Sequence, residues 1–160
     1  MSMNNIYSVQ LIEEKIHVDF IDSGNDMEDY FLKYAVTNIE GKCRNEGYIK
    51  KNSCKVSEYS AGKLESDFII YKVKYICEVC YPHIDMEVIC KINSINNSIG
   101  MRAFIDEEEN NPMTIYISNE LNPNVDISNY NEGQMVKIKI NGHRFDRNDK
   151  TITVLGEIIT

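Results

Sequence analysis

The chain has 160 residues, of which 42% are hydrophobic and 26% are charged, and its net charge at pH 7 is −8. This composition is typical of a folded protein and excludes an intrinsically disordered one, and the length allows one medium domain or two small ones. We find no apolar stretch near the roughly 20 residues of a membrane helix and no signal peptide in residues 1–6, so we expect an intracellular protein.

The first residues indicate a strand over 6–20, in which apolar and polar positions alternate. A helix is predicted over 24–38, because Ser23 followed by Asp26 is typical of a helix start. Apolar residues then recur at helical spacing and form one stripe: Met27, Tyr30, Phe31, Tyr34 and Ala35.

Gly41 is expected to end this helix, and β-type segments follow over 42–50, 53–59 and 67–80. Pro82 closes this half of the chain. A strand, a helix and three more strands can bury one face of an antiparallel sheet beneath the helix.

The second half is predicted to be nearly all strand. Its clearest segment runs from Val136 to Ile140 and alternates strictly between apolar and lysine residues, so Lys137 and Lys139 must share one strand face. Five short strands with a polar break between the third and the fourth match an OB-type barrel. The expected strands are Val88–Ile95, Ile99–Ile105, Met113–Ser118, Met135–Phe145 and Thr151–Ile158. The sequence therefore predicts an α+β protein with a domain over 1–81 and a five-stranded OB barrel over 82–160.

Few residues in the sequence suggest catalysis or metal binding. Cys77 and Cys80 have the spacing of a zinc half-site, but no second CxxC pair accompanies them, and we expect the five cysteines to be reduced thiols. The acidic run 106–109 is expected to be a solvated connection, with a divalent-cation site as the alternative. We predict no catalytic residue, no cofactor and no metal.

A basic cluster near the end is more informative in such an acidic chain. It consists of Lys137, Lys139, Arg144, Arg147 and Lys150. Cationic side chains beside aromatic rings are what an OB barrel uses to bind a single strand. The alternative is that these residues form the solvated face of an antiparallel sheet.

Several segments resemble, in order along the chain, the stalk subunit of multisubunit RNA polymerases, which is the seventh-subunit family of polymerase II and its archaeal counterpart. The last hairpin resembles that family in its alternation from Val136, its Gly142 and Arg144, and its turn Asp146–Asp149. Three earlier segments also resemble it: Glu40–Cys43, Ser60–Tyr75 and Met113–Pro123.

The resemblance implies an RNP-like tip domain that docks at the base of the polymerase clamp, followed by an OB barrel near the exit path of nascent RNA. It implies docking residues Gly41, Tyr48, Ala61, Gly62 and Leu64, and RNA-contacting residues Arg102, Tyr116, Lys137, Lys139, His143 and Arg144. The expected partners are the largest polymerase subunit, the clamp-base subunits, a small companion stalk subunit and nascent single-stranded RNA.

The source suggested by this divergent sequence is a large DNA virus, which would place the protein in the virion and the host cytoplasm. A stalk of polymerase I or III, or of a protist with an AT-rich genome, is the alternative, and a cellular protein would be nuclear. Two other functions stay open: a free-standing OB protein that binds single-stranded RNA, and an enzyme that uses Cys77, Cys80 or the acidic run.

Overall fold

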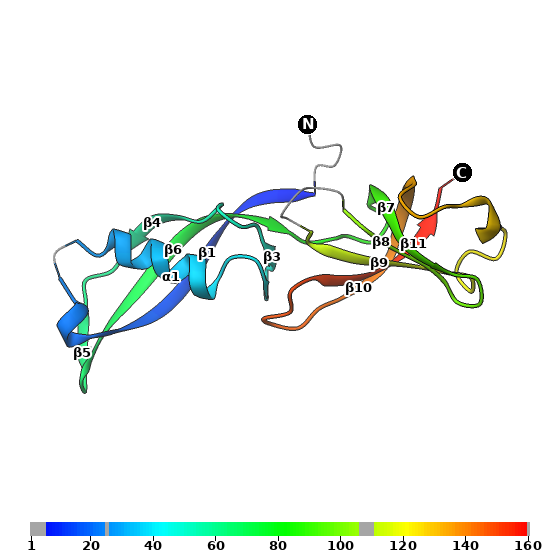
Figure 1. Ribbon diagram of the computed structural model, residues 1–160. Coiled ribbons are helices and arrows are strands. Elements are labelled where there is room, and N and C mark those ends of the chain that lie inside the picture. The colour runs from blue at the N-terminus through cyan, green and yellow to red at the C-terminus, as the bar shows by residue number, and fades with distance from the viewer. Residues whose placement is uncertain (1–5, 25, 106–110, 160) are drawn as a thin grey trace.

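The computed structural model describes residues 6–24, 26–105 and 111–159. The molecule is elongated, with an antiparallel sheet and its helix at one end and a closed barrel at the other (Figure 1). The expected α+β class and the five-stranded, OB-like barrel are confirmed. No helix among the described residues is long and apolar enough to cross a membrane.

Two long strands form the spine of the sheet. β1 (Tyr7–Asp19) and β6 (Phe68–Cys80) pair antiparallel along their whole length, from Tyr7 opposite Cys80 to Asp19 opposite Phe68. Short strands line the other edge of β6: β2 (Cys43–Arg44), β3 (Gly47–Ile49), β4 (Lys55–Tyr59) and β5 (Lys63–Glu65). The sheet therefore has a junction end, at Tyr7 and Cys80, and a tip end, at Asp19 and Phe68.

Helix α1 (Glu28–Asn38) covers one face of this sheet. Met27, Phe31 and Ala35 are buried, and Tyr30 and Tyr34 pack beside them, so the predicted stripe is confirmed. The predicted helix start at Ser23 is wrong. Asp19 caps the short 3-10 helix η1 (Phe20–Asp22), and the Ser23 hydroxyl donates to the Phe20 carbonyl, which completes that turn instead.

The first strand presents different residues on its two faces. Ile12, Ile16 and Val18 are buried beneath α1, whereas Val9 and Leu11 lie on the opposite face and are 71% and 57% exposed. We name this opposite side the open face of the sheet. Alternation predicted the strand, but it did not show which set of residues would be covered.

Two details of the sheet differ from the sequence-based expectation. The segment 42–50 is a tight hairpin of β2 and β3 rather than one strand, because Gly47 adopts φ +131° and turns the chain back. β5 was not predicted, since its three residues are all exposed and show no alternation.

The barrel follows directly after β6. Its strands are β7 (Glu87–Asn96), β8 (Gly100–Phe104), β9 (Met113–Ser118), β10 (Met135–Arg144) and β11 (Ile152–Ile158). They close in the order β10-β11-β9-β8-β7, with β11 parallel to β9 and the other pairs antiparallel. Five strands closed in a Greek-key order are the pattern of an OB-type barrel.

The sheet and the barrel are joined by more than the connecting chain. The Cys43 amide donates to the Asp149 carbonyl, and the Asn148 amide donates to the Cys43 carbonyl, each at 2.8 Å. Ile6, Cys43, Tyr48 and Cys80 also belong to the same buried cluster as the barrel core. The hairpin of β2 and β3 is therefore fixed against the turn between β10 and β11.

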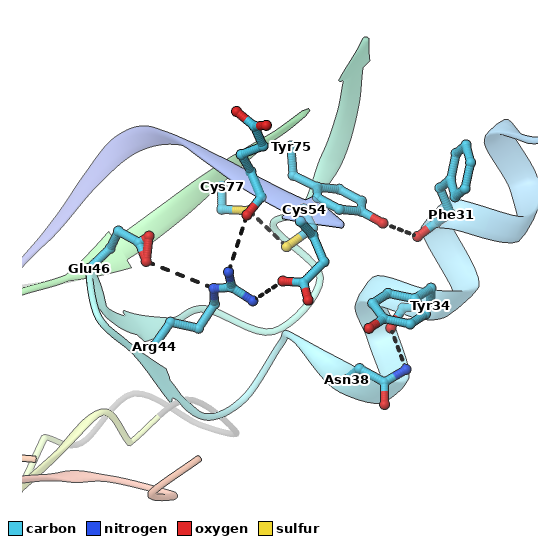
Figure 2. Close-up of polar contacts among 10 residues, drawn as sticks. Phe31, Tyr34, Asn38, Arg44, Glu46, Cys54, Tyr75 and Cys77 are labelled. Carbon is cyan, nitrogen blue, oxygen red and sulfur yellow. Dashed lines mark hydrogen bonds and ion pairs between the residues drawn. The ribbon is translucent and has the colours of Figure 1, made fainter. Parts of the chain in front are cut away.

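Arg44 of β2 forms ion pairs with two carboxylates near the junction end of the sheet. Its guanidinium contacts the Glu14 carboxylate closely and lies 3.8 Å from Glu46 (Figure 2). Arg44 is only 9% exposed, so the buried charge depends on these carboxylates. The ion pair ties the hairpin across the sheet to β1.

Candidate functional site

The strongest candidate for a ligand-binding surface lies on the outside of β8 and β9. Arg102 and Tyr116 are directly opposite each other on these strands, and Leu155 of β11 is opposite Tyr116. Ile115 and Ile117 are buried in the barrel, so Tyr116 projects outward, as predicted, and is 41% exposed. One row across the barrel thus presents a cation, a phenol ring and an aliphatic side chain.

A hollow of about 240 Å³ adjoins this row. Arg102 and Tyr116 line it together with Ser94, Asn96, Ile99 and Met101. The exposed ring can stack on a nucleobase, and the guanidinium can pair with a phosphate or stack in turn. We call this set of residues the barrel hollow.

The predicted lysine strip lies elsewhere. Lys137 and Lys139 project outward from β10, as the alternation predicts, but β10 is separated from β8 and β9 by β7 on one side and β11 on the other. Lys137 is 3.9 Å from Glu87, and Lys139 is 4.0 Å from Asp85. Neighbouring carboxylates thus offset both charges, which the strand sequence alone could not show.

A bulge separates the last two predicted RNA-contacting residues from that strip. The register of β10 shifts between Ile140 and Gly142, after which His143 pairs with the core residue Val154 and Arg144 with the exposed Thr153. His143 is therefore turned inward and Arg144 outward.

The imidazole of His143 is half-buried between aromatic rings at the junction. Its ring centroid is 5.0 Å from that of Tyr81 and 6.1 Å from that of Phe145. Its Nδ1 atom is buried and has no hydrogen-bond partner among the described residues. His143 thus packs against aromatic rings at the junction. The six predicted RNA-contacting residues do not lie on one surface.

The five predicted docking residues also fall into two groups. Gly41 and Tyr48 lie at the junction end of the sheet, where Tyr48 pairs with Cys80 and is 2% exposed. Ala61, Gly62 and Leu64 lie at the tip end, where Leu64 pairs with Ile69. At about 3.3 Å per residue along β6, the groups are roughly 35 Å apart.

Further apolar side chains gather at the tip end and were not predicted. Phe20, Ile21 and Phe68 are exposed there, as is Leu64. We call these four residues the apolar tip. A turn with two exposed apolar residues in sequence, Phe20 and Ile21, was the available signal, because a solvated turn normally carries polar side chains.

Gly62, a docking residue implied by the resemblance, is closely surrounded by other side chains. Its φ is not positive, and the restriction is one of space. A Cβ atom added there would lie 2.5 Å from Cγ2 of Ile69 and 3.0 Å from the Tyr71 ring.

The cysteines are buried and face different surroundings. Cys77 belongs to the cluster beneath α1, with its sulfur 2.8 Å from that of Cys54 (Figure 2). Cys80 belongs instead to the cluster at the junction. Burial raises the pKa of the Cys90 thiol to about 12, and burial with the nearby Asp149 carboxylate does the same for Cys43. In the described part of the chain, no three histidine, cysteine or acidic side chains gather as a metal site. The acidic run 106–109 lies outside the described residues.

Comparison with known proteins gives one informative relative. No protein-family model matches the chain. It is 22% identical over 171 aligned residues to a protein of Acanthamoeba polyphaga mimivirus named "Putative DNA-directed RNA polymerase subunit". The alignment covers 99% of this chain and 85% of the mimivirus protein, so the similarity includes both the sheet and the barrel.

Proposed function

We propose that this protein is a non-catalytic stalk subunit of a DNA-directed RNA polymerase encoded by a large DNA virus. The observation that carries the proposal is the end-to-end similarity to a viral protein named as a polymerase subunit. The order of the fold supports it, since a helix-covered antiparallel sheet precedes an OB-like barrel, as the resemblance to stalk subunits implies.

In this proposal the tip end of the sheet docks at the base of the polymerase clamp. The apolar tip supports the assignment, because Phe20, Ile21, Leu64 and Phe68 are exposed apolar side chains at this end, and covering them with a partner gains free energy. Of the residues implied by resemblance, Ala61, Gly62 and Leu64 belong to this contact. Gly41 and Tyr48 lie at the junction end, where Tyr48 is buried, so they would support docking only indirectly, by shaping the hairpin of β2 and β3.

The barrel would contact RNA that the polymerase has already delivered. The barrel hollow is the better candidate for this contact, because Arg102 and Tyr116 lie side by side and have no carboxylate paired with them among the described residues. Lys137, Lys139 and Arg144 would add electrostatic guidance on other sides of the barrel. A net charge of −8 disfavours tight independent binding, so delivery by the polymerase matters.

Affinity purification of the tagged protein from infected cells tests the proposal. The largest polymerase subunit should be recovered in stoichiometric amount, together with promoter-independent transcription activity. Absence of the largest subunit from the eluate, or active polymerase purified through another subunit without this chain, would contradict the stalk assignment. A virion location would follow from finding the chain in purified particles.

The second candidate function is a free-standing protein that binds single-stranded RNA, and the barrel hollow favours it. The isolated protein would then bind a short RNA, and its affinity would fall steeply as salt rises. Binding that appears only within the polymerase favours the stalk.

A further inference from the structure

The open face of the sheet carries a basic patch close to the tip end. Lys15 of β1 and Lys72 of β6 are directly opposite each other, and both are exposed. In the next row toward the tip, His17 of β1 and Lys63 of β5 flank Ile70 of β6. Residues opposite each other in antiparallel strands share a face, so these four cationic or titratable side chains point the same way.

The patch is not neutralised within the described part of the chain. No carboxylate there forms an ion pair with Lys15, Lys63 or Lys72, whereas Lys74 in the neighbouring row is 3.0 Å from Glu58. Like charges directly opposite in a sheet are destabilising. Lys15 and Lys72 stay opposite each other in an otherwise acidic protein, so an external anion can bind there and offset their repulsion.

Carboxylates limit the patch on both sides. Toward the barrel the next row holds Glu13, Lys74 and Glu58, and toward the tip it holds Asp19, Phe68 and Glu65. A nucleic-acid backbone following the strands would meet these acidic rows as well as the lysines. A short cluster of carboxylates fits the two basic rows without meeting the acidic ones.

The same face offers an apolar contact nearby. Leu11 and Ile76 are directly opposite each other and are 57% and 40% exposed, and Val9 adjoins them. Leu11 lies four residues before Lys15, which corresponds to about 13 Å along the strand. An extended segment could place apolar side chains on Leu11 and Ile76 and acidic side chains on the basic patch, with an uncharged or basic residue over the row of Glu13, Lys74 and Glu58 between them.

We infer that the open face binds an extended acidic segment of a protein partner, with its carboxylates on Lys15, Lys63 and Lys72 and an apolar residue on Leu11 and Ile76. This site adjoins the apolar tip, because the ring centroids of His17 and Phe68 are 6.1 Å apart, and it is distinct from the barrel hollow. It rests on the sheet alone and does not require the proposed polymerase function.

A peptide titration with the full chain tests the inference. The probe is a fluorescent synthetic peptide with two leucines placed about four residues before a run of glutamates, and a short single-stranded RNA is the competitor. Lys15→Glu should weaken peptide binding about tenfold or more, because it replaces attraction by repulsion. It also places a carboxylate opposite Lys72, so the melting temperature should hold or rise.

Lys33→Glu is the matched control, since Lys33 lies on α1 and the substitution changes the net charge by the same amount. It should leave peptide binding within about twofold of the wild type. Absence of peptide binding, or equal binding by the Lys15→Glu variant, would overturn the inference. Displacement of the peptide by the RNA would overturn it in favour of a nucleic-acid site.

Zero-length carbodiimide coupling in the purified native complex gives a second measurement. Lys15, Lys63 or Lys72 should couple to carboxylates of another protein chain. If polymerase subunits co-purify but these lysines couple to no partner, the inference fails while the proposed function stands. If no polymerase subunit co-purifies but the peptide binds, the proposed function fails and the inference stands.

Discussion

The hydroxyl of Tyr75 donates a hydrogen bond of 2.8 Å to the backbone carbonyl of Phe31 (Figure 2). This buried contact joins the middle of β6 to the first turn of α1, and it fixes the helix on the sheet. Burial is the main cause that raises the pKa of this phenol well above its ordinary value, so it stays a neutral donor.

Tyr75→Phe should lower the free energy of unfolding by about 1–2 kcal/mol, because the Phe31 carbonyl loses its side-chain donor. Urea denaturation measures this change. Tyr59→Phe is the control, since Tyr59 packs on the same Phe31 ring through its own ring only and should change stability by less than about 0.5 kcal/mol. Equal effects of the two substitutions would contradict the role of the hydrogen bond.

Tyr116→Ala should weaken RNA contact in the assembled complex by about 1–3 kcal/mol, the usual contribution of one stacked base. Crosslinking yield to nascent RNA, or affinity for a short RNA, reports it. Tyr116→Phe keeps the ring and should retain most of the signal. A loss in both variants would mean that the hydroxyl, and not stacking, makes the contact.

Replacing Lys137 and Lys139 together by glutamine should reduce RNA crosslinking less than Arg102→Gln does. Both lysines already have a carboxylate within 4.0 Å, so part of their charge is offset. Assembly with the polymerase should be unchanged in either variant. A larger loss from the lysine pair would place the RNA on the β10 side of the barrel.

Gly62→Ala should lower the free energy of unfolding by about 1–3 kcal/mol, because its Cβ would overlap the Ile69 and Tyr71 side chains. Gly24→Ala is the matched control, since an added Cβ there meets no atom within 4 Å. Thermal unfolding compares the two. A Gly62→Ala variant as stable as Gly24→Ala would show that the Ile69 and Tyr71 side chains move aside without loss of stability.

A mild disulfide-forming oxidant should crosslink Cys54 to Cys77, whose sulfurs lie 2.8 Å apart. Each thiol loses its proton and one electron to the oxidant as the S–S bond forms. Mass spectrometry under non-reducing conditions should find this pair and no bond to Cys43, Cys80 or Cys90, and Cys54→Ser should abolish it. The crosslink should raise stability by about 3 kcal/mol, since it closes a loop between residues 23 apart in sequence.

Local sequence patterns predicted much of this fold. The apolar stripe of α1 and the alternation from Val136 to Ile140 repeat at the periods of a helix and a strand, and each buries the residues expected. The short hairpin at Gly47 and the strand β5 have no such repeat, because too few residues take part. Their positions depend on pairing with β6, which is distant in sequence.

The candidate site was harder to predict for the same reason. Tyr116 could be placed outward from its neighbours Ile115 and Ile117, whereas its pairing with Arg102 depends on the register between two strands. The inward turn of His143 depends on a bulge after Ile140, and the partners of Lys137 and Lys139 come from another segment. Strand register and bulges are properties of pairs of strands, so one strand's alternation cannot reveal them.

The two main-chain hydrogen bonds at Cys43 have a mechanical consequence. They hold the hairpin of β2 and β3 against the turn at Asn148, so the sheet and the barrel keep a set angle instead of swinging about the connection near Pro82. A rotation of the tip end is then carried through this joint and becomes a larger sweep at the far end of the barrel. A small change in how the tip end is bound would therefore reorient the outer surface of the barrel.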